Sequence, residues 1–484
     1  MLKIPKCMST QHPDNVNKPQ FSATAEVGGE DEIEEAYHAF SEFGCDEQMW
    51  DFEGKEVDNF VVKKLLSKHE DFFKDHQIGK DLFITFRVPN PSVERAEAKI
   101  LLETLESIPR SFDVAKLFYK NDVAPVFEVI VPMTTSAKCV DRVYSYYKDF
   151  VVGKQAKPVK AGDIKIADWI GEFKPEKINV IPLFEDMERM INADEIVKTY
   201  LLDKGVDYQR VFLARSDPAM NYGLISAVVL NKIALQRLWQ LSADIGVKIF
   251  PIVGIGSAPF RGNLTPGNVE GVLKEYPSNH TFTIQSAFKY DFEKSSVKTA
   301  TKKLSEKTSS KPQKVDEELC MKLVEKYSVE YQRQVSLLAP VINNVAKYVP
   351  QRRRRKLHIG LFGYSRNMSG ITLPRAIPFT AAMYSIGFPP ELLGLNALDD
   401  ADITFLKNIY VSFDKDLTDA LAYLNVDCPF IPKDILKTVA SMELSFEINK
   451  EHKSITNNII KSLKNGGDIG PELLKAAHIR GFLG

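Results

Sequence analysis

Short apolar runs recur along most of this 484-residue chain, and nearly every run ends at a polar residue suited to bind phosphate or a metal. Stretches with helical spacing separate most of these runs. Buried-strand signals that alternate with helices are typical of a closed parallel (β/α)8 barrel of the TIM type, and we predict this α/β fold. The eight predicted strands are 44–50, 82–86, 126–131, 178–184, 210–214, 247–253, 281–285 and 357–362.

Two carboxylates follow consecutive predicted strands, Glu185 after 178–184 and Asp217 after 210–214. In a TIM-type barrel the chemistry takes place at the carboxyl ends of the strands, and adjacent strands lie about 4.8 Å apart. An oxygen-only pair without Cys or His fits Mg²⁺ or Mn²⁺ better than zinc. We therefore expect a divalent metal on this pair. The alternative is that Glu185 caps the next helix and Asp217 is a turn residue.

A glycine-rich loop follows the predicted strand 247–253. Its backbone amides, at Gly256 and Ser257, are candidates for cradling an anion, and Arg261 adds a guanidinium that can bind phosphate through two hydrogen bonds. The loop matches a dinucleotide fingerprint only at its first two glycines, since Pro259 stands in the third place. The alternative is a flexible loop with a solvated arginine.

Four further cations lie at the ends of predicted strands or in the turns after them. Several cations on one rim, facing a metal, would bind a small substrate that carries phosphate and carboxylate groups. Any one of them alone is more often a surface ion pair, which contributes little to stability. The four candidates are Arg87, Arg215, Lys289 and Arg366.

His12 lies in an N-terminal segment rich in Pro, Gly and Asn, where Pro13 restricts the backbone next to it. A histidine can move protons at physiological pH. Composition alone gives His12 no special status among the eight histidines, and a histidine in a loop is usually a surface residue.

Composition excludes several classes of protein. The formal net charge is −1, so no global field favours nucleic acid or an anionic membrane. The basic run 352–356 is more often a solvated helix end or subunit contact than a nucleic-acid site. The chain holds no apolar run of membrane-spanning length and no secretory signal at its start. Five dispersed cysteines fit reduced thiols, so we expect a cytoplasmic protein.

We expect one catalytic barrel domain over residues 1–484. Residues 1–30 are interpreted as an extended loop, and 305–316 as an exposed, linker-like insertion. A helix is predicted over about 316–348. The pattern becomes helical from residue 370 to 484, and we expect these helices to pack on the barrel or on a partner subunit.

Seven motifs, taken together and in order, resemble those of the archaeal-type phosphoenolpyruvate carboxylases. The similarity runs from residue 9 to the C-terminus and covers almost the whole chain. The motifs are STQHPDN (9–15), VIVPMTTSA (129–137), IPLFEDM (181–187), ARSDPAMNYG (214–223), GIGSAPFRGNL (254–264), TIQSAFKYD (283–291) and RAIPF (375–379).

This resemblance implies a homotetramer of (β/α)8 barrels that carboxylates phosphoenolpyruvate with bicarbonate, using Mg²⁺ or Mn²⁺. Glu185 and Asp217 would then hold the metal, and Arg261 would neutralise charge on the transferred phosphoryl group. His12 would take the proton from carboxyphosphate and release carbon dioxide beside the enolate. The catalytic candidates are His12, Arg215 and Arg261, and the substrate-binding candidates are Arg87, Gly256, Ser257, Lys289 and Arg366.

Two other functions compete with this one. A metal-dependent aldolase or lyase acting on a pyruvate-type enolate would also hold its metal on Glu and Asp from neighbouring strands. It would not need Arg261 to bind phosphate. A non-catalytic protein that binds anions or RNA would depend instead on the basic run 352–356.

Overall fold

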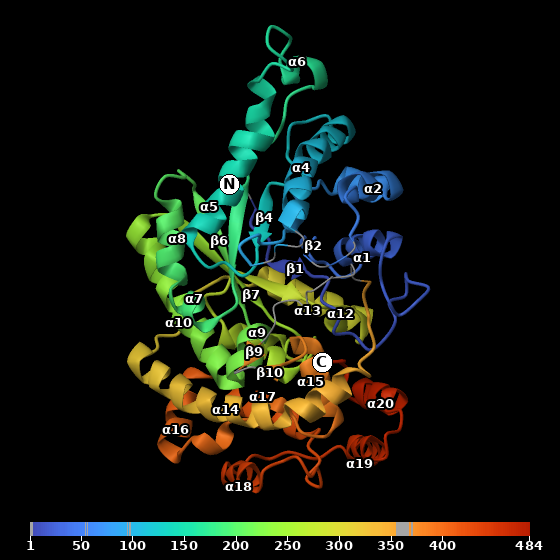
Figure 1. Ribbon diagram of the computed structural model, residues 1–484, viewed down its shortest axis with the longest axis vertical. Coiled ribbons are helices and arrows are strands. Elements are labelled where there is room, and N and C mark those ends of the chain that lie inside the picture. The colour runs from blue at the N-terminus through green and yellow to red at the C-terminus, as the bar shows by residue number, and fades with distance from the viewer. Residues whose placement is uncertain are drawn as a thin grey trace.

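The computed structural model describes residues 3–53, 55, 57–93, 95, 98–354, 367–368 and 371–484. Eight parallel strands pair in chain order and close into a barrel, which confirms the predicted fold (Figure 1). The strands are β1 (Cys7–Ser9), β2 (Glu47–Asp51), β3 (Phe83–Arg87), β4 (Glu128–Val131), β5 (Asn179–Phe184), β6 (Tyr208–Ala214), β7 (Lys248–Gly254) and β8 (Thr281–Ile284).

One stave of the barrel differs from the prediction. The first seven predicted strands correspond to β2–β8. The eighth strand of the barrel is β1, which lies within the N-terminal segment interpreted as loop. β1 pairs in parallel with both β2 and β8, so the barrel closes without residues 357–362, which lie outside the described residues. Three residues, Cys-Met-Ser, carry almost no local strand preference. Pairing on both sides makes them a strand.

The inside of the barrel has a polar and an apolar layer. Near the amino ends of the strands, the Arg210 guanidinium pairs with Glu47 at 2.7 Å and Glu128 at 2.8 Å, and all three side chains are buried. Above them lies an apolar layer that includes Ile181, Phe212 and Ile252. This packed interior closes the barrel from below, so a small ligand can enter only at the carboxyl ends of the strands.

Helices surround the barrel on its outer face, mostly following the strands (Figure 1). They are α1 (Glu30–Ser41), α2 (Val61–Lys68), α3 (Glu70–Asp75), α4 (Ala98–Tyr119), α5 (Ala137–Ser145), α6 (Ile166–Ile170), α7 (Met187–Ile191), α8 (Ala193–Leu201), α9 (Ser216–Tyr222), α10 (Leu224–Ile245), α11 (Val269–Glu275), α12 (Ser286–Tyr290) and α13 (Lys294–Glu306).

The C-terminal helices form a second core that packs on the barrel, one of the two arrangements that the sequence left open. α14 (Glu317–Ala346) begins where the sequence indicates, because the Asp316 carboxylate caps it by accepting from the Leu319 amide at 3.1 Å. α9 and α10 contribute residues to this second core, which ties it to the barrel. The remaining helices are α15 (Ala376–Ser385), α16 (Asp400–Ile409), α17 (Phe413–Leu421), α18 (Lys433–Ser441), α19 (Lys450–Lys464) and α20 (Gly470–Arg480).

The insertion at 305–316 joins α13 to α14 and is anchored to the barrel rather than fully exposed. The Lys307 ammonium donates to the carbonyl oxygens of Tyr276 and Asn279, at 2.7 and 3.1 Å. Val315 is buried, and its amide donates to the Gln236 side chain at 2.8 Å. The expectation of an exposed linker therefore holds only for part of this segment.

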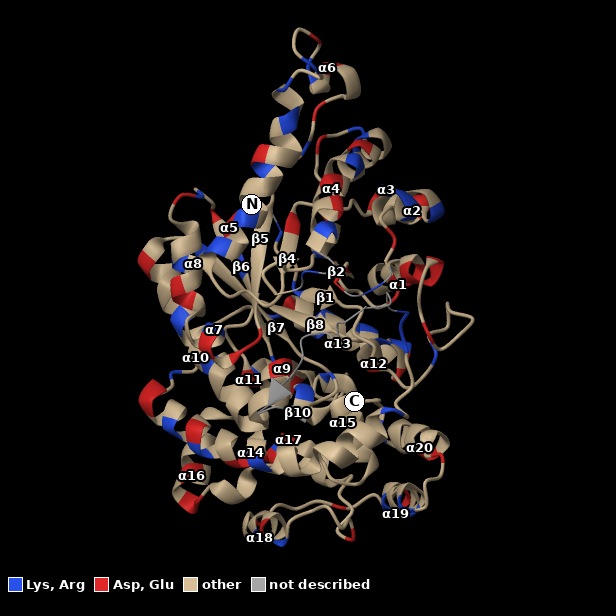
Figure 2. Cartoon of the chain, in the orientation of Figure 1, with Lys and Arg blue, Asp and Glu red and all other residues tan. Residues whose placement is uncertain are grey.

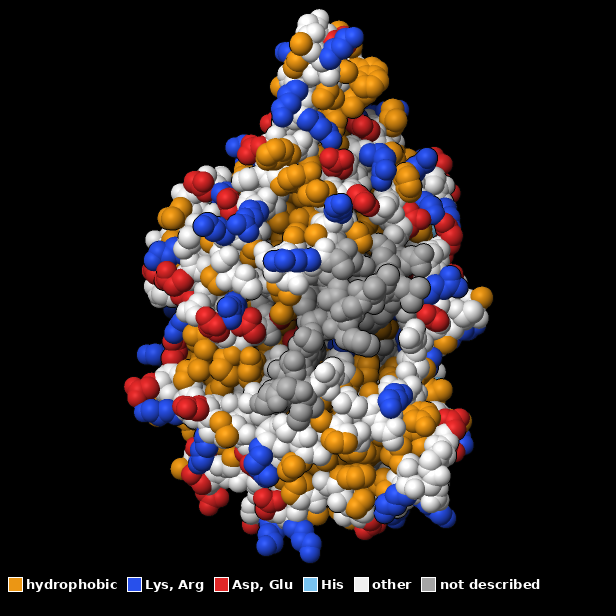
Figure 3. Space-filling view, viewed as in Figure 1, with side chains coloured by type: hydrophobic (Ala, Val, Ile, Leu, Met, Phe, Trp, Pro, Cys, Tyr) orange, Lys and Arg blue, Asp and Glu red, His pale blue; other side chains and the backbone are white. Residues whose placement is uncertain are grey.

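An arm, defined here as residues 146–178, projects from the barrel and carries α6 at its tip (Figure 1). Several of its large apolar side chains are exposed, among them Trp169 at 67% and Phe150 at 60%, and the space-filling view shows apolar atoms at this end (Figure 3). Elsewhere, acidic and basic side chains are interspersed over the outer helices (Figure 2). No helix among the described residues is long and apolar enough to cross a membrane.

Candidate active site

A cavity of about 510 Å³ opens at the carboxyl ends of the barrel strands, and the C-terminal helices cover part of it. Among the described residues, its wall carries eight Lys or Arg against three Asp or Glu, so the cavity attracts anions. The cations are Lys55, Arg87, Arg215, Arg261, Lys347, Arg352, Arg353 and Arg375, and the carboxylates are Glu53, Glu185 and Asp217.

Glu185 and Asp217 both line this cavity, one just after β5 and the other in the first turn of α9, after β6. The Met133 amide donates to Oε2 of Glu185 at 2.6 Å and holds that carboxylate in place. No group of three or more His, Cys, Asp or Glu residues in the described part of the chain could hold a metal. Two carboxylates fit Mg²⁺ or Mn²⁺, which keep waters or substrate oxygens as their other ligands.

Arg261 is buried at the wall of the cavity, in the loop after β7. Hydrogen bonds from Nε, Nη1 and Nη2 hold its guanidinium in place. Nε donates to the Ser216 hydroxyl at 3.1 Å, and Nη2 donates to the Gln285 side chain at 2.6 Å. Nη1 donates to the Asp14 carboxylate at 3.2 Å and to the carbonyl oxygen of Gly484 at 2.7 Å. A cation fixed in this way costs little reorganisation when an anion binds.

The predicted amide cradle at Gly256 and Ser257 is not formed. The Gly256 amide donates to the carbonyl oxygen of Arg261 at 2.9 Å, and the Ser257 amide faces the Asp14 carboxylate at 3.5 Å. Neither residue lines the cavity. A Cβ on Gly256 would lie 2.9 Å from the Arg261 guanidinium carbon, so this glycine makes room for the arginine instead of binding an anion.

His12 lines the cavity from the loop after β1. Its Nδ1 lies 2.9 Å from the Thr10 hydroxyl, which orients the ring. Removal from bulk water, with Lys55 and Arg87 nearby, holds the pKa of His12 well below its ordinary value. The ring is therefore neutral at physiological pH and can accept a proton.

Arg87 lines the cavity as predicted, but Asp51 at the end of β2 holds its guanidinium. Nε and Nη2 of Arg87 each lie 2.7 Å from one Asp51 oxygen, and Glu53 lies 3.1 Å from Nη2. The Lys55 ammonium also pairs with Asp51. Burial would raise the pKa of Asp51, but Arg87 and Lys55 hold that pKa well below its usual range.

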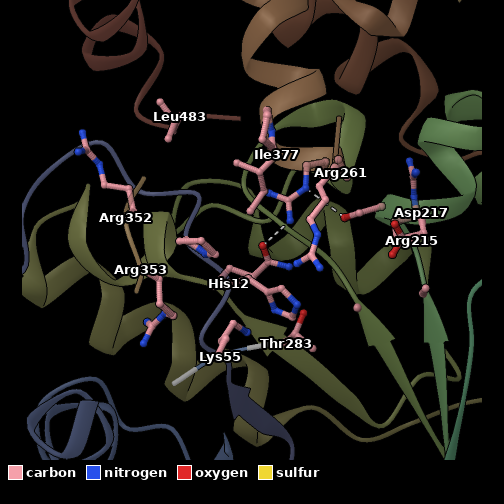
Figure 4. A pocket seen from close by; sticks show the side chains of 18 of the residues that line it. His12, Lys55, Arg215, Asp217, Arg261, Thr283, Arg352, Arg353, Ile377 and Leu483 are labelled. Carbon is pink, nitrogen blue, oxygen red and sulfur yellow. Dashed lines mark hydrogen bonds between the residues drawn. The ribbon is translucent and has the colours of Figure 1, made fainter. Parts of the chain in front are cut away.

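Arg215 also lines the cavity, yet its hydrogen bonds point to neighbouring protein groups. Nη1 donates to the carbonyl oxygen of Phe260 at 3.2 Å, and the guanidinium interacts with Tyr276. In Figure 4, Arg215 and Asp217 lie on one side of the cavity, opposite Arg352 and Arg353. Through Phe260, Arg215 contacts the loop that carries Arg261.

One further predicted cation, Lys289, does not line the cavity. Lys289 is fully buried, and its ammonium donates to the Ser9 hydroxyl, the Thr10 carbonyl oxygen and the Glu35 carboxylate, at 3.0, 3.2 and 3.0 Å. It holds the N-terminal segment and does not line the cavity. Arg366 lies outside the described residues.

Within the basic run 352–356, Arg352 and Arg353 are buried, and Arg354 is exposed. Arg352 donates to the carbonyl oxygens of Asn15 and Val16, at 3.2 and 2.9 Å. The guanidinium of Arg353 pairs with Glu32 and Glu35 at 2.9 and 2.6 Å. Both arginines are buried, while Arg355 and Lys356 lie outside the described residues. Arg352 and Arg353 therefore direct their charge into the protein and not toward solvent.

Several residues of the site were missed by the sequence reasoning. Lys55 and Arg375 line the cavity, and Asp14 and Gly484 orient Arg261. Asp14 lies two residues after His12, within a motif already singled out, so that motif could have signalled it. Gly484 is 223 residues away from Arg261 in the chain, and no local pattern reveals that contact.

Comparison with known proteins gives a consistent result. A family model described as phosphoenolpyruvate carboxylase matches residues 4–484. The chain is 56% identical to the phosphoenolpyruvate carboxylase of Methanothermobacter thermautotrophicus over the whole of both chains. It is 51% identical to that of Pyrococcus furiosus, over 99% of this chain and all of the relative, and 46% identical to that of Halobacterium salinarum over the whole of both.

Proposed function

Because the chain belongs to the phosphoenolpyruvate carboxylase family, we propose that it carboxylates phosphoenolpyruvate with bicarbonate and releases oxaloacetate and phosphate. One structural observation supports the proposal independently of the family comparison. The cationic cavity at the carboxyl ends of the strands also contains carboxylates that follow the neighbouring strands β5 and β6. Both substrates are anions, and phosphoenolpyruvate carries a phosphate and a carboxylate. The cavity matches that charge.

Arg261 binds the phosphoryl group in this proposal. Bicarbonate oxygen attacks the phosphorus atom, and the bond from phosphorus to the enol oxygen breaks with its electron pair going to that oxygen. The products are carboxyphosphate and the enolate of pyruvate. The buried guanidinium of Arg261 faces the negative charge that develops on the phosphoryl oxygens.

His12 acts as the base in the next step. Its neutral ring takes the proton from the carboxyl group of carboxyphosphate, and carbon dioxide leaves as the carbon–oxygen bond to phosphate breaks. The enolate carbon then attacks carbon dioxide to form oxaloacetate. Leu483 and Ile377 contribute apolar wall to the cavity, which helps to keep out water that would protonate the enolate.

Glu185 and Asp217 are the residues that would hold Mg²⁺ or Mn²⁺. A divalent cation bound there would supply Lewis-acid stabilisation of the developing enolate oxygen. The Met133 amide keeps Glu185 oriented for this task.

The test is an assay coupled to malate dehydrogenase, run with and without bicarbonate. We expect oxaloacetate and phosphate in equal amounts, and only when bicarbonate is present. Phosphate release with pyruvate as the sole organic product would contradict the proposal. Arg261→Ala separates the carboxylase from an aldolase or lyase, since it should abolish turnover in the first and be mild in the second.

We propose that the protein is a cytoplasmic homotetramer. The exposed apolar side chains of the arm, such as Trp169 and Phe150, support self-association, because exposed apolar clusters mark interaction sites. All five cysteines are buried and free, which supports a reducing compartment. Light scattering during size-exclusion chromatography tests the assembly, and a monomeric mass would contradict it.

A further inference from the structure

Lys55 is a cavity residue that has no role in the mechanism described so far. It lies in the loop after β2 and lines the cavity together with His12 and Arg87. Only 3% of the residue is exposed. Figure 4 shows its side chain in the same part of the cavity as His12 and Thr283. A buried ammonium at a cavity wall needs a physical reason, because burial of a charge costs free energy.

The pairing of Lys55 with Asp51 does not account for this burial by itself. Arg87 already holds both oxygens of Asp51, each at 2.7 Å, so that carboxylate is satisfied without the lysine. Among the described residues, Asp51 is the one hydrogen-bond acceptor that the Lys55 ammonium has. An ammonium has three N–H donors. Two of them stay available to a ligand in the cavity.

Lys55 and His12 line the same cavity, and their charges influence each other. Lys55 is the strongest of the charged neighbours that lower the pKa of His12. Burial, opposed by Asp51, in turn lowers the pKa of Lys55 to about 7. An anion beside the ammonium would favour its charged form. An anion bound beside His12 in this shared cavity can also accept a hydrogen bond from Lys55.

Building on the proposed carboxylase reaction, we propose that Lys55 is a further catalytic residue, which binds the bicarbonate anion beside His12 and then the carboxyl group of carboxyphosphate. Lys55 forms and breaks no covalent bond. It donates hydrogen bonds to the carboxyl oxygens, while His12 takes the carboxyl proton and the carbon–oxygen bond breaks toward phosphate. Arg261 remains the partner of the phosphoryl group. Lys55 therefore binds the bicarbonate-derived carboxyl group, and Arg261 binds the phosphoryl group.

The test compares Lys55→Met with a matched control, Lys307→Met, in the full-length enzyme. Lys307 has a pKa that is also lowered to about 7, mainly by burial, but it bonds to carbonyl oxygens away from the cavity. Steady-state kinetics give KM for each substrate separately, and product analysis gives the ratio of oxaloacetate to phosphate. For Lys55→Met we expect KM for bicarbonate to rise at least about tenfold, as for loss of a hydrogen bond to a charged group.

KM for phosphoenolpyruvate should change far less in Lys55→Met, and the share of pyruvate among the products should rise. Lys307→Met should leave both KM values near those of the wild type. An equal rise in both KM values, or no change in either, would overturn the role of Lys55. Should Lys55→Met not fold, Lys55→Arg keeps the charge but moves it. A KM for bicarbonate within twofold of the wild type in that variant would also overturn the role.

The same experiment keeps this inference apart from the proposed function. A wild-type enzyme that makes no oxaloacetate would refute the carboxylase reaction, and the role of Lys55 with it. Oxaloacetate from the wild type, together with an unchanged KM for bicarbonate in Lys55→Met, would refute the role of Lys55 alone.

Discussion

At the scale of single residues, the surroundings of His12 decide its protonation state. Two cations, Lys55 and Arg87, lie near its ring, and the Thr10 hydroxyl lies 2.9 Å from Nδ1. The cations favour the neutral imidazole, and the Thr10 hydroxyl orients its ring. A base requires this neutral form. A histidine on the surface would have neither constraint.

We predict that His12→Asn still breaks down phosphoenolpyruvate but forms roughly 100-fold less oxaloacetate, the usual loss when a general base is removed. Phosphate and oxaloacetate measured in the same reaction check this outcome. His478→Asn is the control, because His478 is an exposed residue on α20. An unchanged yield of oxaloacetate per phosphate in His12→Asn would remove this residue from the mechanism.

Glu391 is a buried carboxyl group in the C-terminal core, where it accepts a hydrogen bond from the Tyr384 hydroxyl at 2.6 Å. Burial raises its pKa to about 7 in the folded protein, from 4.5 for a free side chain. The folded state therefore holds a proton between these two pKa values that the unfolded state releases. The contribution of Glu391 to stability is present below pH 4.5 and is lost as the pH rises through 7.

We predict that Glu391→Gln gains stability over the wild type as the pH rises from 5 to 8. The glutamine stays neutral and can still accept from Tyr384, so the difference in the free energy of unfolding should grow by at most about 3 kcal/mol. Thermal denaturation midpoints of both proteins at pH 5 and 8 measure this. A difference that does not vary with pH would show that Glu391 is ionised in the folded protein.

At the scale of elements, the segment after α20 reaches back into the site. The Leu483 amide donates to the carbonyl oxygen of Asp14 at 2.7 Å, and the carbonyl oxygen of Gly484 accepts from Arg261 at 2.7 Å. Leu483 also lines the cavity. The end of the chain thus connects the N-terminal segment, the loop after β7 and the cavity wall.

We predict that deletion of residues 483–484 lowers kcat/KM for phosphoenolpyruvate about tenfold, because Arg261 loses an oriented acceptor. Steady-state kinetics check the effect, and the melting temperature should also fall, since Leu483 is buried in the second core. Lys475→Ala, an exposed position on α20, serves as the control. A deletion variant with kcat/KM within twofold of the wild type would show that the tail does not position Arg261.

At the scale of the whole molecule, ligands that bind only the folded barrel should stabilise it. A ligand at 100 times its Kd contributes about 2.7 kcal/mol to the free energy of unfolding. We predict that Mn²⁺ with phosphoenolpyruvate, without bicarbonate, raises the melting temperature by more than phosphoenolpyruvate alone. Asp217→Asn should lose the part of this rise that depends on the metal.

Differential scanning fluorimetry measures these shifts without any need for turnover. Asp427→Asn is a suitable control, because Asp427 is an exposed carboxylate paired with Lys453 far from the cavity wall. A metal-dependent rise that persists in Asp217→Asn would contradict the assignment of this residue as a metal ligand.

Much of the barrel could be predicted because most of its strands are short apolar runs with polar residues at their ends. The same rule identified Glu185, Asp217 and Arg261 as cavity residues. It could not identify the partner of each polar group. The ammonium of Lys289 bonds to the first stave instead of facing the cavity, and the amide of Gly256 bonds to the loop that carries it.

The amino-acid sequence by itself determined the alternation of strands and helices that forms the barrel. It also determined the carboxylates that follow β5 and β6 and the cations at the ends of other strands. These depend on residue type and spacing along the chain, which local physics can interpret. Only the tertiary structure decided that Cys7–Ser9 closes the barrel, that Gly484 reaches Arg261 and that Lys55 and His12 line one cavity. Each of these brings distant segments of the chain together, and the free energy of that arrangement exists only once the chain has folded.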